Sequence, residues 1–407
     1  MSPIPEIYIR DYEYPLPEER IAQTPLNERD SSKLLIYKNG EISESIFRNI
    51  TDFIPGNSFI ALNDTKVIRA RLLFRKHTGA KIEIFCIEPA DNQVVESSFL
   101  LKGSAEWICL VGNASKWRDE VLFFYFKIGG EVCILKAEKK VAEKGEFRIR
   151  FSWEPSGLTF SEVLESTGDV PLPPYIKRKS NENDVMRYQT VYAGAEGSVA
   201  APTAGLHFTE EILKSFREKS ACLDYVTLNV GAGTFKPVKT EKASGHNIHS
   251  ELFTVRKAFF ENILNNEYES LAAVGTTTVR TLESLYWLGV IDGKLRGEIV
   301  TLNQWDVYQY ASSGRVSFKD SVRKILKYME KQDIDILTGA TSLMIVPGYE
   351  FKVTDILITN FHMPRSSLLL LVAAFIGEDW KKVYRFAIKN GFRFLSYGDS
   401  SLLFRNE

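Results

Sequence analysis

Hydrophobic and polar residues alternate with a period of two through the region from about residue 69 to residue 153. The clearest stretches are Lys81–Phe85, Glu131–Leu135 and Glu146–Arg150, each of which puts its apolar side chains on one face of a strand. Gly129 and Gly130 favour a two-residue hairpin turn. Short strands at close spacing, without a convincing helical period between them, predict a small all-β barrel or sandwich.

After this region, apolar runs typical of buried strands alternate with helical patterns. Strands are predicted at Tyr225–Val230, Ser270–Val274 and Asp355–Thr359, and small or polar residues follow each of them directly. An earlier apolar run, Phe59–Leu62, likewise ends in turn-forming side chains. Strands that alternate with helices predict an α/β fold, in which ligands bind at the carboxyl edge of the sheet.

We therefore predict two domains. An α/β main domain, with a mixed, barrel-like sheet and helices, is assembled from residues 1–68 and 153–407 and carries a small β-barrel inserted at 69–152. Within the main domain, residues 289–340 form an extra segment with one amphipathic helix that buries Val322, Ile325, Leu326 and Met329. We expect no chemistry in this segment.

Composition narrows the class of protein. The chain of 407 residues is 44% hydrophobic and 25% charged, with a formal net charge of −1, which argues against non-specific coating of nucleic acid. Its longest apolar run is about half the ~20 residues of a membrane span, and the first residues lack the pattern of a secretory signal. Four scattered cysteines indicate a reduced, cytoplasmic protein without a cysteine-based metal site.

Two common ligand motifs are incomplete. Gly231 and Gly233 resemble the start of a dinucleotide-binding turn, but Lys236 stands where a third glycine belongs. His246 and His249 with the carboxylate Glu251 could form a zinc site, yet the surrounding residues are typical of a loop. We disfavour both a nucleotide-dependent oxidoreductase and a metal hydrolase.

Three loops carry more telling chemistry. Pro202–Thr209 is a tight turn with one imidazole, and Thr209 can cap the helix that follows; the same residues would also suit a purely structural turn. Gly275–Arg280 places three threonines and an arginine at a helix start, where they could hold an anion or simply cap the helix. His362–Arg365 offers another imidazole and guanidinium, and Ser366 or Ser367 caps the next helix.

The distribution of the histidines favours acid–base chemistry. Four of the five lie in motif loops, and only His77 stands apart. Near the C-terminus, the run Phe394–Asp399 indicates that the end of the chain docks back onto the body of the protein.

Taken together, these motifs carry a resemblance to a known family. The stretches that match are Leu62–Thr65, Tyr188–Tyr192, Pro202–Thr209, Val226–Pro237, Val274–Ser284, Thr359–Ser366 and Ser396–Asp399. They resemble the S-adenosylmethionine:tRNA ribosyltransferase-isomerases of queuosine biosynthesis over nearly the whole chain. Departures are few: Ile248 replaces a common methionine, Ser400 and Ser401 replace small or apolar residues, and the extra segment looks long.

The resemblance implies a two-domain enzyme that transfers and isomerises the ribosyl moiety of S-adenosylmethionine. The acceptor would be the aminomethyl group of preQ1 at the wobble position of tRNA, and the products epoxyqueuosine-tRNA, adenine and methionine. Hydrogens on the carbon beside the sulfonium are acidic, so a positioned base can remove one. The implied reaction needs no metal or redox cofactor, and we expect a monomer without a membrane partner.

The site residues predicted from chemistry and position fall into three groups. For proton transfer we expect His207, His249 and Asp399, with Glu251 orienting His249. The residues expected to bind S-adenosylmethionine are Thr203, Gly205, Gly233, Thr234, Thr276, Thr277, Thr278, Arg280 and His362. Arg365, Lys177 and Arg178 are expected to face the anticodon, and Tyr188 or Tyr397 to stack on a base. The alternative is a non-enzymatic RNA-binding protein that uses the barrel as its platform.

Overall fold

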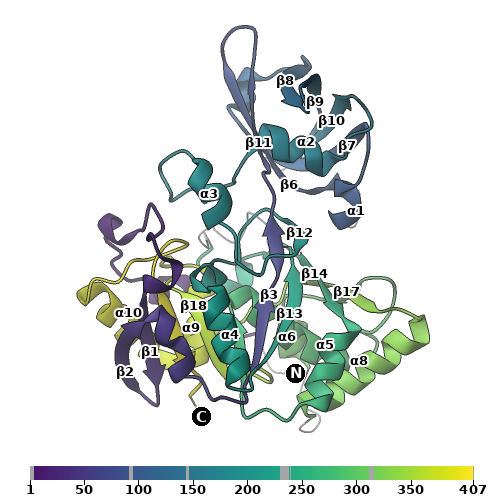
Figure 1. Ribbon diagram of the computed structural model, residues 1–407. Helices are drawn as coiled ribbons and strands as arrows, with labels where there is room; N and C mark the ends of the chain where they lie inside the picture. The colour runs from purple at the N-terminus through teal and green to yellow at the C-terminus, as the bar shows by residue number, and fades with distance from the viewer. Residues whose placement is uncertain are drawn as a thin grey trace.

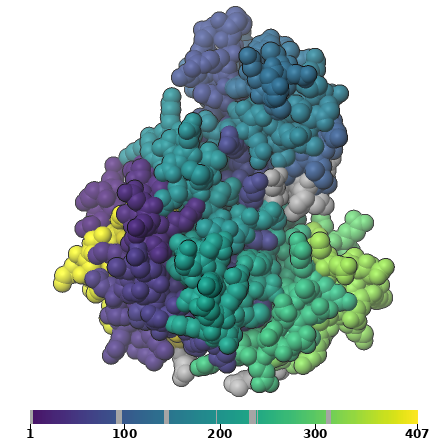
Figure 2. Space-filling view, viewed as in Figure 1, coloured from purple at the N-terminus to yellow at the C-terminus, as the bar shows by residue number. Residues whose placement is uncertain are grey.

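The computed structural model describes residues 4–90, 95–143, 146–229, 238, 240–310 and 316–406. Two large sheets organise them (Figure 1). The first is a mixed, ten-stranded sheet with helices, and the second is an antiparallel, seven-stranded half-barrel, which confirms the predicted fold class. In Figure 2 the half-barrel forms a lobe that projects from the body.

The ten-stranded sheet is the core of the main domain. In spatial order its strands are β16 (Val300–Leu302), β17 (Ile336–Thr341), β14 (Glu251–Arg256), β13 (Cys222–Leu228), β3 (Phe59–Asn63), β15 (Leu271–Val274), β18 (Ile356–Asn360), β19 (Ser400–Phe404), β1 (Lys33–Lys38) and β2 (Glu41–Ile46). The four central strands β13, β3, β15 and β18 run parallel, so their carboxyl ends meet at one edge. This is the edge at which the sequence places its polar loops.

Both faces of the central strands are covered, as continuous apolar runs require. All five residues of β3 are buried: Phe59 and Ala61 pack on one side with α6 (Thr276–Val290), while Ile60 and Leu62 pack on the other with α4 (Glu210–Glu218). The remaining main-domain helices are α3 (Glu182–Arg187), α5 (Lys257–Asn265), α7 (Asp306–Gln309), α8 (Phe318–Gln332), α9 (Ser367–Ile376) and α10 (Trp380–Lys389). The predicted caps are present, since Thr209 accepts from Ile212 N and Ser366 from Leu369 N.

The half-barrel has its own apolar core. Its strands, in spatial order, are β11 (Gly168–Asp169), β5 (Arg71–Arg75), β6 (Lys81–Pro89), β7 (Ser104–Gly112), β10 (Glu146–Glu154), β9 (Glu131–Glu143) and β8 (Leu122–Ile128), with helices α1 (Val95–Phe99) and α2 (Phe160–Thr167). Gly129 and Gly130 turn β8 into β9 with φ of 58° and 89°, as expected for the hairpin. A short pair, β4 (Thr65–Val67) with β12 (Ala195–Ser198), lies between the two large sheets.

The extra segment and the C-terminal segment both add strands to the ten-stranded sheet. The extra segment contributes β16, β17 and α8, whose Val322, Ile325 and Met329 are buried. The C-terminal strand β19 inserts between β18 and β1, which confirms that the end of the chain docks. Among the described helices, none combines the length and the apolar character that a membrane span requires.

Candidate active site

A hollow of about 710 Å³, counting its open mouth, lies at the carboxyl ends of β15 and β18. We call it the main hollow. Its polar lining comes from Tyr175, Thr203, Thr276, Thr277, Thr359, Asn360, His362, Ser366 and Ser396. Three of the motif loops therefore converge here, although their residues lie as far apart in the chain as Thr203 and Ser396.

The start of α6 forms one wall of the main hollow. Gly275 has a φ of 97°, which a side chain would strain, and this conformation turns β15 directly into a helix of 15 residues. Thr278 Oγ1 donates back to Val274 O at 2.7 Å, while Thr276 and Thr277 line the hollow. Because the first N–H groups of a helix lack intrahelical acceptors and carry its positive dipole end, this wall suits an anionic group.

Arg280 lies one helical turn further along α6 and is buried. Its Nη1 pairs with Glu251 Oε2 at 3.1 Å, from the first residue of β14. Among the described residues, its Nε and Nη2 have no hydrogen-bond partner. Buried donors without partners cost about 1–3 kcal/mol each, so this guanidinium is suited to a ligand that completes its bonds.

His207 lies behind the main hollow, at the end of the short 3-10 helix η7 (Thr203–His207), with both ring nitrogens hydrogen-bonded. Nδ1 lies 2.9 Å from Ser32 Oγ and Nε2 lies 3.2 Å from Asn360 Nδ2. Asn360 Oδ1 in turn accepts from Thr203 Oγ1 at 2.9 Å. This series of hydrogen bonds fixes Asn360 and Thr203, which both line the main hollow.

His362 is the histidine that lines the main hollow. Its Nε2 lies 3.0 Å from Thr359 Oγ1, and among the described residues Nδ1 has no partner. Tyr384 and Tyr14 hold its backbone, since Tyr384 OH accepts from His362 N and Tyr14 OH donates to His362 O. Burial lowers the pKa of His362 to about 3, so the ring is neutral near pH 7.

The other predicted proton-transfer groups are placed differently. Asp399 is buried and accepts from Lys33 N at 3.1 Å and Arg393 N at 2.8 Å, so its carboxylate ties β1 to the C-terminal loop. Burial raises the pKa of Asp399 despite these bonds. Glu251, expected to orient His249, instead pairs with Arg280. His249 itself is exposed at the same edge of the sheet.

The extra segment, which we expected to carry no chemistry, fixes the loop that contains His246 and His249. Gln304 Nε2 donates to His246 O at 2.5 Å, and Gln304 Oε1 accepts from Ile248 N at 3.1 Å. A glutamine after a strand gives no local signal of this role, because its two partners lie more than fifty positions earlier in the chain.

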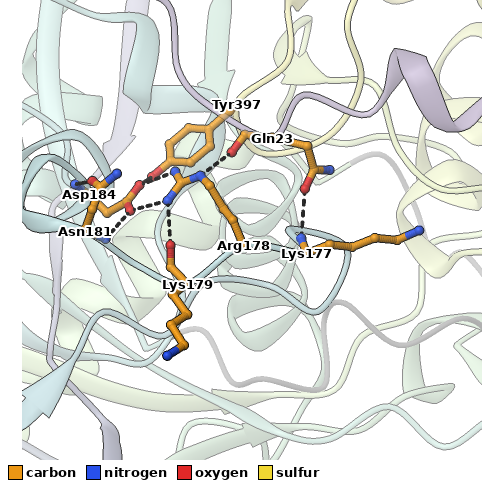
Figure 3. Close-up of polar contacts among 7 residues, drawn as sticks. All are labelled: Gln23, Lys177, Arg178, Lys179, Asn181, Asp184 and Tyr397. Atoms are coloured by element: carbon orange, nitrogen blue, oxygen red, sulfur yellow. Dashed lines mark hydrogen bonds and ion pairs between the residues drawn. The ribbon is translucent and has the colours of Figure 1, made fainter.

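The residues expected to bind RNA fall into two environments, and Figure 3 shows Lys177, Arg178 and Tyr397 among them. Lys177 and Arg365 are at the surface, paired with Glu18 and Glu13. Arg178 instead holds the buried Asp184 with two bonds of 2.6 and 2.7 Å, and Tyr397 OH donates to the same carboxylate at 2.7 Å.

The two tyrosines expected to stack on a base are both in the core. Tyr188 has no exposed surface and Tyr397 is 3% exposed, with their rings edge to face at 5.8 Å. Neither ring is free to receive a base in this conformation.

Three other predicted ligand-binding residues complete the set. Gly205 is buried beside Tyr192, and a Cβ there would lie 2.0 Å from the Tyr192 hydroxyl, so the glycine permits close packing. Gly233 and Thr234 lie outside the described residues. In the described ranges, histidine, cysteine and carboxylate side chains do not gather in threes where a metal ion could bind.

A hollow at the carboxyl ends of parallel strands, with a helix start and a neutral histidine in its lining, is typical of α/β enzymes. The sequence model of the family described as queuosine biosynthesis protein matches residues 9–403. The chain belongs to this family.

Similar proteins agree over the full length. A protein of Halothermothrix orenii named S-adenosylmethionine:tRNA ribosyltransferase-isomerase is 37% identical over 401 residues, covering 97% of this chain and 99% of its own. A protein of the same name from Sulfurihydrogenibium sp. is 36% identical over 409 residues, with the same coverage. The crystal structure of an S-adenosylmethionine tRNA ribosyltransferase from Thermotoga maritima, 28% identical, covers 97% of this chain and 99% of its own with a TM-score of 0.44. The family match and the two relatives confirm the predicted enzyme class.

Proposed function

We propose that the main hollow is where this S-adenosylmethionine:tRNA ribosyltransferase-isomerase takes S-adenosylmethionine apart. The enzyme transfers and isomerises the ribosyl group onto the aminomethyl group of preQ1 in tRNA, forming epoxyqueuosine. The observation that carries the assignment is the convergence of the α6 start, Arg280 and His362 on one edge of the sheet.

The methionyl carboxylate is placed at the start of α6. The free N–H groups of the first turn and the partnerless Nε and Nη2 of Arg280 supply donors for one anion. Glu251 keeps the guanidinium buried in one orientation. This pose leaves the sulfonium and the sugar beside Thr203, Asn360 and His362.

His362 is the proposed base for the hydrogen next to the sulfonium. It is neutral, it lines the hollow, and Nδ1 is available when Nε2–H donates to Thr359 Oγ1. His207 acts through Asn360 as a positioning residue, and Asp399 fixes the loop that carries Ser396. His249 remains a candidate for the acid that protonates the departing adenine, because its loop precedes Glu251 at the same edge.

The RNA is expected to approach over the exposed Lys177 and Arg365. Arg178, which is committed to Asp184, shapes this surface without being free to pair with a phosphate. A monomer in the cytoplasm is the proposed setting, and the free state of all four cysteines supports a reducing compartment.

The test is release of adenine from S-adenosylmethionine in the presence of an anticodon stem-loop that carries preQ1. The wild-type chain should release adenine, and Arg280→Lys should raise the KM for S-adenosylmethionine by about 10- to 100-fold at little cost in kcat. Lysine keeps a positive charge beside Glu251, so the melting temperature should hold. Arg256→Lys, at the exposed end of β14, is the matched control.

Two results would count against the proposal. A wild-type KM in Arg280→Lys would remove the guanidinium from substrate binding. Stem-loop binding without any adenine release by the wild type would favour the non-enzymatic alternative.

A further inference from the structure

A second hollow lies directly beside the main one. Three guanidinium groups, from Arg29, Arg187 and Arg393, line it together with His207 and Tyr397, and we call it the arginine hollow. The two hollows share Ser396, and the His207–Asn360 hydrogen bond joins a lining residue of one to a lining residue of the other. On the same measure the arginine hollow is about 280 Å³, against about 710 Å³ for the main hollow.

Backbone carbonyl groups hold all three arginines, and for Arg393 the acceptor is Thr24 O at 3.4 Å. Arg29 donates to Gln189 O at 2.7 Å, Leu206 O at 3.2 Å and Met186 O at 2.6 Å, so its side chain has one conformation. Arg187 Nη1 donates to Asn27 O at 2.8 Å. Among the described residues, the buried Nε of Arg187 has no acceptor.

Positive charge in the arginine hollow exceeds negative charge. Asp399 lies 3.4 Å from Arg393 Nη2, whereas within the described residues neither Arg29 nor Arg187 forms an ion pair. Burial and the repulsion of Arg187 lower the pKa of Arg29, and burial also lowers that of Arg187. If these side chains served only to bond carbonyl groups, neutral amides would do so without like-charge repulsion.

We propose that the arginine hollow binds one phosphodiester of the RNA backbone next to the nucleotide whose base enters the main hollow. The inference rests on the tRNA substrate assigned to this enzyme. Guanidinium groups bind phosphate oxygens through paired, charge-assisted hydrogen bonds, and three of them around a small hollow form such a site. The arginine hollow is less than half the size of the main hollow, so we assign the nucleoside to the main hollow and only a backbone phosphate to the arginine hollow.

A second source of the same chemistry is the methionyl carboxylate of S-adenosylmethionine. That carboxylate is already assigned to the start of α6 in the main hollow, with Arg280 one helical turn further along. Moreover, Arg187 ends α3 (Figure 1), a short helix that also carries the exposed Met186, and Arg187 itself is partly exposed. Both points favour the RNA backbone.

Arg187→Gln tests the proposal in the full-length enzyme. Affinity for the preQ1 stem-loop, measured by fluorescence anisotropy at several salt concentrations, should fall about tenfold, and the slope of log affinity against log salt should become shallower by about one. The KM for S-adenosylmethionine and the melting temperature should stay at wild-type values. Arg323→Gln, on the exposed face of α8, removes the same charge far from the hollow and should change nothing.

A backbone substitution locates the contact. Neutral methylphosphonate is placed, one linkage at a time, on either side of the wobble nucleotide. One position should weaken binding to the wild type about tenfold and weaken binding to Arg187→Gln clearly less, because one of the three charges that face this phosphate is already missing. Arg187→Lys, which keeps the charge, should retain part of the affinity if Arg187→Gln proves unstable.

Two outcomes overturn the proposal. Unchanged RNA affinity in Arg187→Gln, with normal adenine release by the wild type, rules out the phosphodiester while leaving the enzyme function intact. A raised KM for S-adenosylmethionine with unchanged RNA affinity assigns the hollow to the methionyl carboxylate instead. Failure of the wild type to release adenine would count against the proposed function, and this result is distinct from both outcomes above.

Discussion

The main hollow and the arginine hollow are neighbours with opposite electrostatics. As far as the structure describes it, the lining of the main hollow contains hydroxyls, one amide and one neutral imidazole but no lysine, arginine or carboxylate. The arginine hollow gathers three guanidinium groups within a smaller space. A wall made by His207, Asn360 and Ser396 divides them.

The contrast fits the two charges that the reaction brings together. A sulfonium is a cation, and placing it among three guanidinium groups would cost Coulomb energy that grows as water is excluded. An RNA phosphate needs such groups. Separate hollows therefore let the enzyme hold a cationic and an anionic substrate side by side. His207, which lies between them, is neutral and adds no further charge.

The largest expected effect tests the chemistry in the main hollow. His362→Gln should lower kcat for adenine release by about 10²- to 10⁴-fold, since glutamine cannot accept the proton, and should leave both KM values within about threefold. The measurement is steady-state kinetics with the preQ1 stem-loop. His77→Gln, at an exposed position of the half-barrel, serves as the control. A wild-type kcat in His362→Gln would show that His362 is not the base, and the main hollow would then lose its proposed catalytic role.

A smaller effect tests the frame of the arginine hollow. Asp184→Asn removes the carboxylate that Arg178 and Tyr397 share and should lower the free energy of unfolding by about 2 kcal/mol, less than the 3–5 kcal/mol of a fully buried pair because Arg178 is partly exposed. Urea denaturation measures it. Glu18→Gln breaks the Lys177 pair, whose side chains are 70% and 84% exposed, and should cost under about 1 kcal/mol. Equal decreases in the free energy of unfolding of the two variants would show that the buried carboxylate has no special part in holding Tyr397 in the lining of the arginine hollow.

Much of this arrangement could be predicted from the sequence, because the signals are local. The polar loops after β15 and β18, the cap at Thr209 and the Gly129–Gly130 turn each follow from a few adjacent residues. Strand alternation likewise predicted the antiparallel strands of the half-barrel. In these cases backbone geometry and side-chain period carry the information.

The contacts that give each side chain its role are not local. His207 bonds to Ser32, which lies 175 positions earlier, and the arginine hollow collects Arg29, Arg187 and Arg393 from three distant segments. Nothing in the sequence near Glu251 distinguishes a partnership with Arg280 from one with His249. Such pairings depend on the order of the strands in the sheet, and the periodicity of a single segment gives no information about that order.

Acid stability compares the histidines of the two hollows. Burial lowers the pKa of both His207 and His362 to about 3, and nearby arginines, Arg393 foremost, add to the shift only at His207. Between pH 6.5 and 3 the unfolded chain therefore binds protons that the folded chain excludes. Stability is complete above pH 6.5 and is lost as the pH falls, by at most about 1.4 kcal/mol per pH unit for each histidine.

Replacing one histidine with a group that does not titrate should flatten this loss. Free energies of unfolding at pH 7, 6, 5 and 4.5 should fall less steeply in His362→Gln than in the wild type, and comparing the slopes of the two proteins cancels the opposite contribution of Asp399, whose pKa is raised. His207→Gln should flatten the curve at least as much, because the guanidinium groups of its own hollow also oppose protonation. Parallel curves for wild type and both variants would mean that the rings take up protons in the folded enzyme, and the wall between the hollows would then carry a charge in acid.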